Sequence, residues 1–153
     1  GTVTGAALTR LIGGKTDIVM MLNGALAGLV AITAEPLTPG PITAMVIGSI
    51  GAVIMYYGTK LLENLGLDDV VGAIPVHMFA GIFGTLVVPL TNTDTSFGTQ
   101  LIGVISVCVF SFILSWITFS TLKSTVGLRI SRAAEKQGTD KAEVGVIAYS
   151  IRD

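Results

Sequence analysis

Four long apolar segments constrain this chain more than any other feature of its sequence. They cover residues 18–34, 42–62, 70–90 and 101–122, and Lys60 is the one Asp, Glu, Lys or Arg within them. A helix needs roughly 20 predominantly apolar residues to cross about 30 Å of hydrocarbon. No segment alternates apolar and polar residues, as the strands of a membrane β-barrel do. The sequence therefore predicts an all-α integral membrane protein, with a transmembrane helix bundle at 1–123 and a tail at 124–153.

Composition excludes several other classes of protein. Charged residues make up 12% of the chain, against about 25% in globular proteins. The formal net charge of -1 leaves no overall basic surface for nucleic acid. One cysteine, Cys108, excludes a disulfide framework within the chain, and we expect no metal or cofactor. A single histidine without a partner acid is not a catalytic set, so the chain is not expected to be an enzyme.

The positions of the basic residues predict an orientation. All nine lie before the first span, at Lys60, or after the fourth span, and the connections 35–41 and 91–100 contain none. Basic loops stay on the cytoplasmic side of a membrane. We therefore expect a multi-pass protein of the cell membrane with a cytoplasmic C-terminus. Because the chain begins with Gly rather than Met, it is also expected to be a piece of a longer protein.

His77 lies near the middle of the third span and is the leading candidate for a functional residue. Ionisable residues inside a membrane are usually functional, and loss of water favours the neutral imidazole, which both donates and accepts a hydrogen bond. The alternative is a structural histidine bonded to a neighbouring helix. Helical spacing predicts that His77 shares one face with three small residues: Ala73, Gly81 and Gly84.

Three further features of the spans concern helix geometry and packing rather than chemistry. Pro75 lacks an N–H group and should therefore free the carbonyl of Val71, four residues earlier. Asn23 is interpreted mainly as the donor or acceptor of a hydrogen bond between helices. The pair Gly24 and Gly28, one helical turn apart, is interpreted as a close-packing surface.

Three sequence motifs together carry a family resemblance. They are Asn-Gly-Ala-Leu-Ala-Gly-Leu-Val-Ala-Ile-Thr-Ala at 23–34, Asp-Asp-Val-Val-Gly-Ala-Ile-Pro-Val-His at 68–77 running on to Gly81-x-x-Gly84, and Gly-Leu-Arg-Ile-Ser at 127–131. The chain closely resembles the C-terminal part of the Amt/MEP/Rh ammonium transporter family, in its bacterial Amt branch. The second motif is the most specific, because it joins an acid pair to a mid-membrane histidine.

The resemblance implies a fold, a function and roles for four residues. The fold would be an eleven-helix subunit, of which this chain supplies the last helices, assembled as a homotrimer in the lipid bilayer. The function would be transport of ammonium or ammonia through a hydrophobic pore. His77 matches a histidine of the proton relay, Leu26 and Ala73 match pore-lining positions, and Asp69 matches an acid that begins the histidine helix.

The sequence also departs from the family in two places. Met78 follows His77, where many members have glycine. Val144 and Val146 stand in the tail where members commonly have His and Glu, which bears on a possible PII-type regulatory partner at the cytoplasmic face. Two alternatives to transport remain open: an ammonium sensor of the same fold that signals through its tail, and a helical membrane subunit with no pore.

Overall fold

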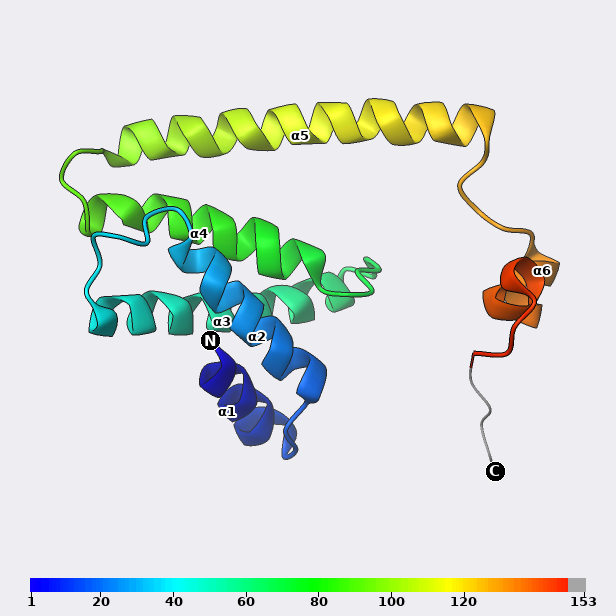
Figure 1. The fold of residues 1–153 in the computed structure, drawn as a ribbon, viewed down its shortest axis with the longest axis horizontal. Helices are drawn as coiled ribbons and strands as arrows, with labels where there is room; N and C mark the ends of the chain where they lie inside the picture. The colour runs from blue at the N-terminus through cyan, green and yellow to red at the C-terminus, as the bar shows by residue number, and fades with distance from the viewer. Residues whose placement is uncertain (149–153) are drawn as a thin grey trace. The chain divides into compact units, whose positions relative to one another are not determined.

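A computed structural model describes residues 1–148, and all the regular structure in this range is helical (Figure 1). The predicted all-α class is confirmed. Its elements in chain order are α1 Thr2–Gly13, α2 Ile18–Ile32, α3 Pro41–Asn64, the wide π-helical turn η1 Ile74–Phe79, α4 Ala80–Val87, the short η2 Val88–Leu90, α5 Phe97–Thr125, α6 Arg132–Gln137 and η3 Asp140–Val144. Residues 149–153, the end of the predicted tail, lie outside the described range.

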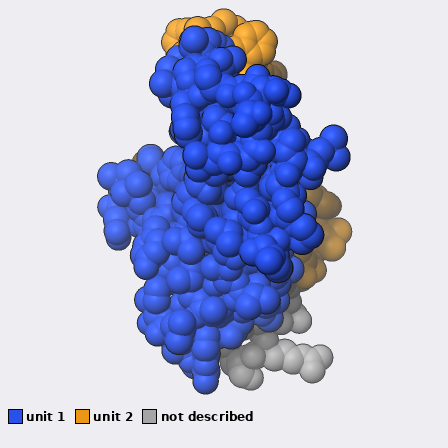
Figure 2. Space-filling view, turned by 90° about the vertical axis from the view of Figure 1, so that its left-hand side faces the viewer, with its two compact units in different colours: residues 1–106 blue, residues 107–153 orange. Residues whose placement is uncertain are grey.

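The chain divides into two compact units, residues 1–106 and 107–153, which Figure 2 colours separately. The boundary falls within α5, so this helix belongs to both units. The first unit contains His77 and every other predicted site residue. It is therefore the unit in which a functional site is sought.

Local chemistry explains where the helices of the first unit begin and end. The Asp17 side chain caps α2 by accepting a hydrogen bond of 3.0 Å from the backbone N–H of Met20. Pro41 opens α3, where its missing N–H group leaves no bond unmade. The chain turns at Gly66, which has a φ of 68° and follows the end of α3 closely.

Helix α2 is the centre of the first unit and packs against α1, α3, η1 and α4. Figure 1 shows it crossing α3 and α4. The buried cluster joins Ala27 of α2, Met55 of α3, Val76 of η1 and Ala80 of α4. Because few large side chains separate these helices, small residues must set the distances between them.

Glycines bring the backbones of α1, α2 and α3 together. A Cβ atom added at Gly28 would lie 3.0 Å from the Cα of Gly1 and 3.1 Å from the carbonyl oxygen of Gly48. A Cβ atom at Gly24 would lie 3.2 Å from the Cα of Gly5. The interpretation of Gly24 and Gly28 as a packing pair is confirmed, and its partners are helices on both sides of α2.

Within residues 1–148, two helices are long and apolar enough to cross a membrane by length and composition: Pro41–Asn64, with 24 residues, and Phe97–Thr125, with 29. Ile18–Ile32 and Ile74–Leu90 are apolar but shorter. The third predicted span, 70–90, becomes helical only at Ile74, because Gly72 has a φ of 74° and interrupts the helix before it. The orientation of the spans stays a prediction.

The second unit contains short helices after α5. Ser131 caps α6 by accepting a hydrogen bond from the N–H of Ala134, and Arg129 forms an exposed ion pair of 2.9 Å with Glu135. The carboxylate of Asp140 accepts a hydrogen bond of 2.9 Å from the N–H of Ala148, which lowers the pKa of Asp140. The tail is therefore locally ordered through residue 148.

Candidate functional site

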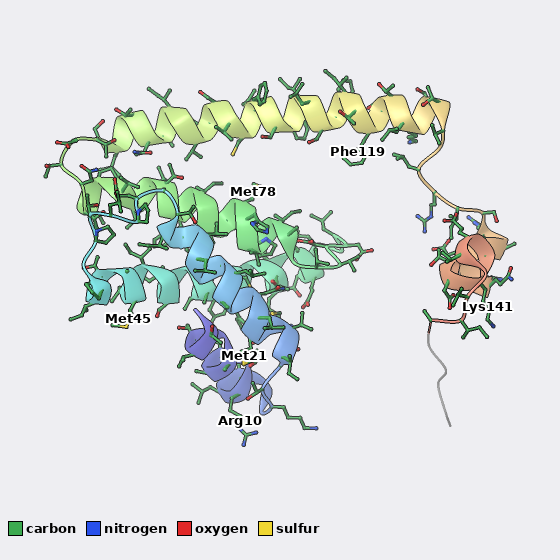
Figure 3. All side chains as sticks on the ribbon, in the orientation of Figure 1. Arg10, Met21, Met45, Met78, Phe119 and Lys141 are labelled. Atoms are coloured by element: carbon green, nitrogen blue, oxygen red, sulfur yellow. The ribbon has the colours of Figure 1, made fainter. Side chains whose placement is uncertain are left out.

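His77 lies within the wide turn η1, two residues after Pro75. Its neighbour Val76 is buried in the core, whereas His77 and Ala73 are exposed in this chain. Met78 is 49% exposed and is labelled on the same helix in Figure 3. The imidazole is therefore exposed on a helix whose Val76 side is buried in the core.

Asp69 caps the beginning of the helix Ile74–Leu90, which contains His77 and is called the histidine helix below. One carboxylate oxygen accepts a hydrogen bond of 2.9 Å from the N–H of Ala73, and the other accepts a bond of 2.8 Å from the N–H of Ile74. These N–H groups belong to the first turn, where no helical carbonyl precedes them. The negative charge also suits the positive end of the helix dipole. Asp69 thus satisfies two backbone donors within one helical turn of His77.

Asn23 connects α2 to the same region from the other side. Its side-chain Nδ2 donates a hydrogen bond of 3.1 Å to the carbonyl oxygen of Val71, 48 residues away. This is the carbonyl that Pro75 was predicted to free. Asn23 therefore donates a hydrogen bond between distant parts of the chain, but its acceptor lies in the turn before η1 rather than within a neighbouring helix. This acceptor is a backbone group that the sequence identified.

The small-residue face predicted around His77 is only partly correct. Ala73 and His77 are exposed, but Gly84 is buried against α2, where an added Cβ atom would lie 2.8 Å from the carbonyl carbon of Ala31. The prediction assumed 3.6 residues per turn throughout. A π-helical turn contains more residues than an α-helical one, so positions on either side of it lose that register.

Leu26 is the remaining predicted pore-lining residue, and it is 47% exposed on α2. The next residue, Ala27, is fully buried in the core. Since α2 and η1 are in contact, Leu26, Ala73 and His77 are exposed residues on two packed elements.

Two contacts in the first unit were not predicted from the sequence. A Cβ atom at Gly58 of α3 would lie 2.6 Å from the ring of Phe79, so this glycine gives the end of η1 its place on α3. The Oγ1 of Thr9 accepts a hydrogen bond of 3.2 Å from the N–H of Asp17 and ties α1 to the start of α2. Neither pairing has a signal in the sequence, because both join residues of unrelated motifs.

The two connections that contain no Lys or Arg, 35–41 and 91–100, are joined by a hydrogen bond between side chains. Asn92 Nδ2 donates a hydrogen bond of 2.9 Å to the Glu35 carboxylate. This bond, and a backbone one from the N–H of Leu37, lower the pKa of Glu35. Among the described residues, no group of three or more His, Cys, Asp or Glu side chains could hold a metal ion.

Comparison with known proteins identifies the class of protein that this helical membrane fold represents. Residues 1–149 match the Ammonium Transporter Family. The chain is similar to the ammonium transporter Amt2 of Archaeoglobus fulgidus, with 39% identity covering 97% of this chain and 36% of the relative. It is also similar to a putative ammonium transporter of Synechocystis, with 36% identity covering 86% of this chain and 30% of the relative.

A solved structure described as a sensor Amt protein has the same fold. It matches with a TM-score of 0.84 and 30% sequence identity, covering 93% of this chain and 38% of that one. The chain belongs to the Ammonium Transporter Family, a family of membrane transporters rather than enzymes. It spans about a third of the length of the relatives that it matches.

Proposed function

We propose that the protein carrying this chain conducts ammonium or ammonia across the cell membrane, and that this chain supplies the C-terminal part of an eleven-helix subunit. The observation that carries the proposal is the setting of His77. It is an exposed imidazole on a helix held by Asp69 and Asn23, in a chain whose relatives are named ammonium transporters.

Elementary electrostatics explains why such a pore would use these residues. An unpaired ammonium ion cannot enter an apolar passage without a large desolvation cost, whereas neutral ammonia can. A neutral imidazole can accept a hydrogen bond from ammonia or donate one to it, and can pass a proton along. Leu26 and Ala73 would line the passage with apolar surface. Potassium has no proton to lose, so the same passage would exclude it.

Uptake of labelled methylammonium by the full-length gene product in a transport-deficient host tests the proposal. We expect His77→Ala to reduce uptake per folded subunit by about tenfold or more, since loss of a positioned proton-transfer group removes 10²–10⁴-fold in enzymes. Met45→Leu is the control, because Met45 is exposed on α3 and carries no proposed role. Uptake by the His77→Ala protein equal to that of the control would refute the relay.

The remaining parts of the proposal concern assembly and orientation. The subunit would form a homotrimer, with both termini of this chain on the cytoplasmic side. In the tail, Val144 and Val146 are 72% and 59% exposed and can accept no hydrogen bond through their side chains. A PII-type regulator at this face would therefore need other tail residues. Cross-linking of the purified transporter tests the homotrimer. A binding assay with the regulator tests the role of the tail.

A sensor function is the second candidate, and one observation favours it: the similar solved structure is described as a sensor Amt protein. A sensor would bind ammonium and change the state of its tail without net transport. Flux measured in proteoliposomes separates the two. Conduction by the purified protein supports the transporter, and ammonium binding without flux supports the sensor.

A further inference from the structure

At the beginning of the histidine helix, one backbone carbonyl has no hydrogen-bond donor within the helix. The carbonyl of Val71 lies before the first residue of η1, where Gly72 interrupts the helix, and Pro75 four residues later has no N–H group to donate to it. An unpaired carbonyl in the hydrocarbon of a membrane is costly, so a donor from another element is needed. Asn23 supplies it through the 3.1 Å bond from its amide. The bond joins α2, the central helix, to the residues just before η1.

Gly72 completes this arrangement. Its φ of 74° is a conformation that favours glycine, and a Cβ atom there would lie 2.7 Å from Nδ2 of Asn23. Its carbonyl accepts a hydrogen bond of 3.1 Å from the N–H of Val76. Glycine is thus the residue that lets the Asn23 amide approach the backbone at this point.

The wide turn η1 contains His77, and the bond from Asn23 to Val71 lies immediately before this turn. π-helical turns are rare and are frequently found at functional sites. If η1 relaxed to an ordinary α-helix, each residue of shift would rotate the following side chains by about 100° around the helix axis. His77 would then leave its present exposed direction. A fixed point immediately before the turn prevents such a shift.

We propose that Asn23 is a positioning residue for His77, acting through the carbonyl of Val71. The inference rests on the proposed function, because the position of His77 matters only if the imidazole takes part in conduction. Asn23 need not touch the transported molecule. Its bond fixes where the histidine helix starts, and the wide turn then sets the direction of the ring.

The test compares three variants in the full-length transporter reconstituted in proteoliposomes. Asn23→Leu keeps the size of the side chain without the donor, Asn23→Gln keeps the donor, and His77→Ala removes the imidazole. The readouts are the maximal rate and KM of methylammonium flux per folded trimer. Asn23→Ala replaces Asn23→Leu if the latter does not accumulate, because it removes the donor without adding bulk.

We expect Asn23→Leu to lower the maximal rate by about tenfold with KM almost unchanged, since small misplacements of a reacting group can cost 10²-fold. Asn23→Gln should retain much of the rate. The thermal midpoint of each variant is measured beside the flux. If Asn23 only stabilised the fold, Asn23→Leu would lower the midpoint and leave the maximal rate per folded trimer unchanged.

Three results would contradict the inference, and each has a different consequence. If His77→Ala impairs flux and Asn23→Leu does not, the positioning role is wrong while the proposed function stands. If His77→Ala leaves flux unchanged, both the relay and the positioning role are wrong. An equal loss in Asn23→Leu and Asn23→Gln would also contradict it, because the donor would then be irrelevant.

Discussion

Gly84 of α4 lies directly against the backbone of Ala31 of α2. A Cβ atom at Gly84 would come within 2.8 Å of the carbonyl carbon of Ala31 and 2.9 Å of its Cα. Backbone atoms cannot move aside as the end of a flexible side chain can. The contact therefore sets how closely the histidine helix approaches the central helix of the first unit.

Gly84→Ala should separate these two helices. We expect a loss of about 1–3 kcal/mol in the free energy of unfolding, as for other overpacked cores. The measurement is the thermal midpoint of the full-length protein in detergent. Gly103→Ala in α5 is the matched control, because a Cβ atom there has no neighbour within 4 Å. Equal midpoints for the two variants would show that the close approach is not required.

Asp69→Ala should destabilise the start of the histidine helix. It leaves the N–H groups of Ala73 and Ile74 without their acceptor. Loss of a helix cap costs about 0.5–2 kcal/mol, and Asp69→Asn should cost less because one oxygen remains. Thermal unfolding in detergent measures both. Asp68→Ala is the control, since Asp69 and not Asp68 accepts the two bonds; an equal effect of the two Ala variants would contradict the capping role.

Gly72→Ala should destabilise more than Gly66→Ala, although both glycines have positive φ values of 74° and 68°. A Cβ atom at Gly66 has no neighbour within 4 Å, so this variant carries only the conformational strain of about 1–2 kcal/mol. A Cβ atom at Gly72 would also press on the Asn23 amide. We expect Asn23→Ala to relieve the excess, which a double-mutant cycle of thermal midpoints measures. An unrelieved excess would show that another contact is responsible.

Acid should loosen the bond between the two connections that contain Glu35 and Asn92. Hydrogen bonds to its carboxylate lower the pKa of Glu35 in the folded protein. The contribution of Glu35 to stability is therefore present above its unfolded pKa of about 4.3 and is lost as the pH falls through the lower folded value. Pepsin cleavage of the connection 91–100 should rise over this range in the parent protein. Glu35→Gln, which does not titrate, should show only the pH dependence of pepsin itself; the same rise in both would exclude Glu35 as the cause.

Ala73→Phe should block conduction without unfolding the protein. Ala73 is exposed in this chain, so a larger side chain can be accommodated outside the core but would occupy the proposed passage. We expect methylammonium flux to fall to background while the thermal midpoint stays within a few degrees of the parent. Met45→Phe, at an exposed position on α3, is the control for added aromatic bulk. Normal flux through the Ala73→Phe protein would remove Ala73 from the pore lining.

Hydrophobic patterning was enough to predict the class of fold and several local details. Apolar segments without period-two alternation can only satisfy their backbone groups as helices, so the helical class followed from composition and length. The absence of an N–H at Pro75 predicted a free carbonyl at Val71, and the structure leaves that carbonyl before the helix, where Gly72 also interrupts it. Close packing at Gly24 and Gly28 followed from their one-turn spacing.

The tertiary structure decided which residues meet. That the Asn23 amide is the donor for Val71, that Gly84 lies on Ala31 and that Gly58 receives Phe79 all depend on helix pairing across many residues of chain. The wide turn at Ile74–Phe79 also broke the 3.6-residue register on which the predicted face of His77 relied. Local sequence fixes which backbone groups need partners, whereas only the packing of whole helices brings a particular partner within reach.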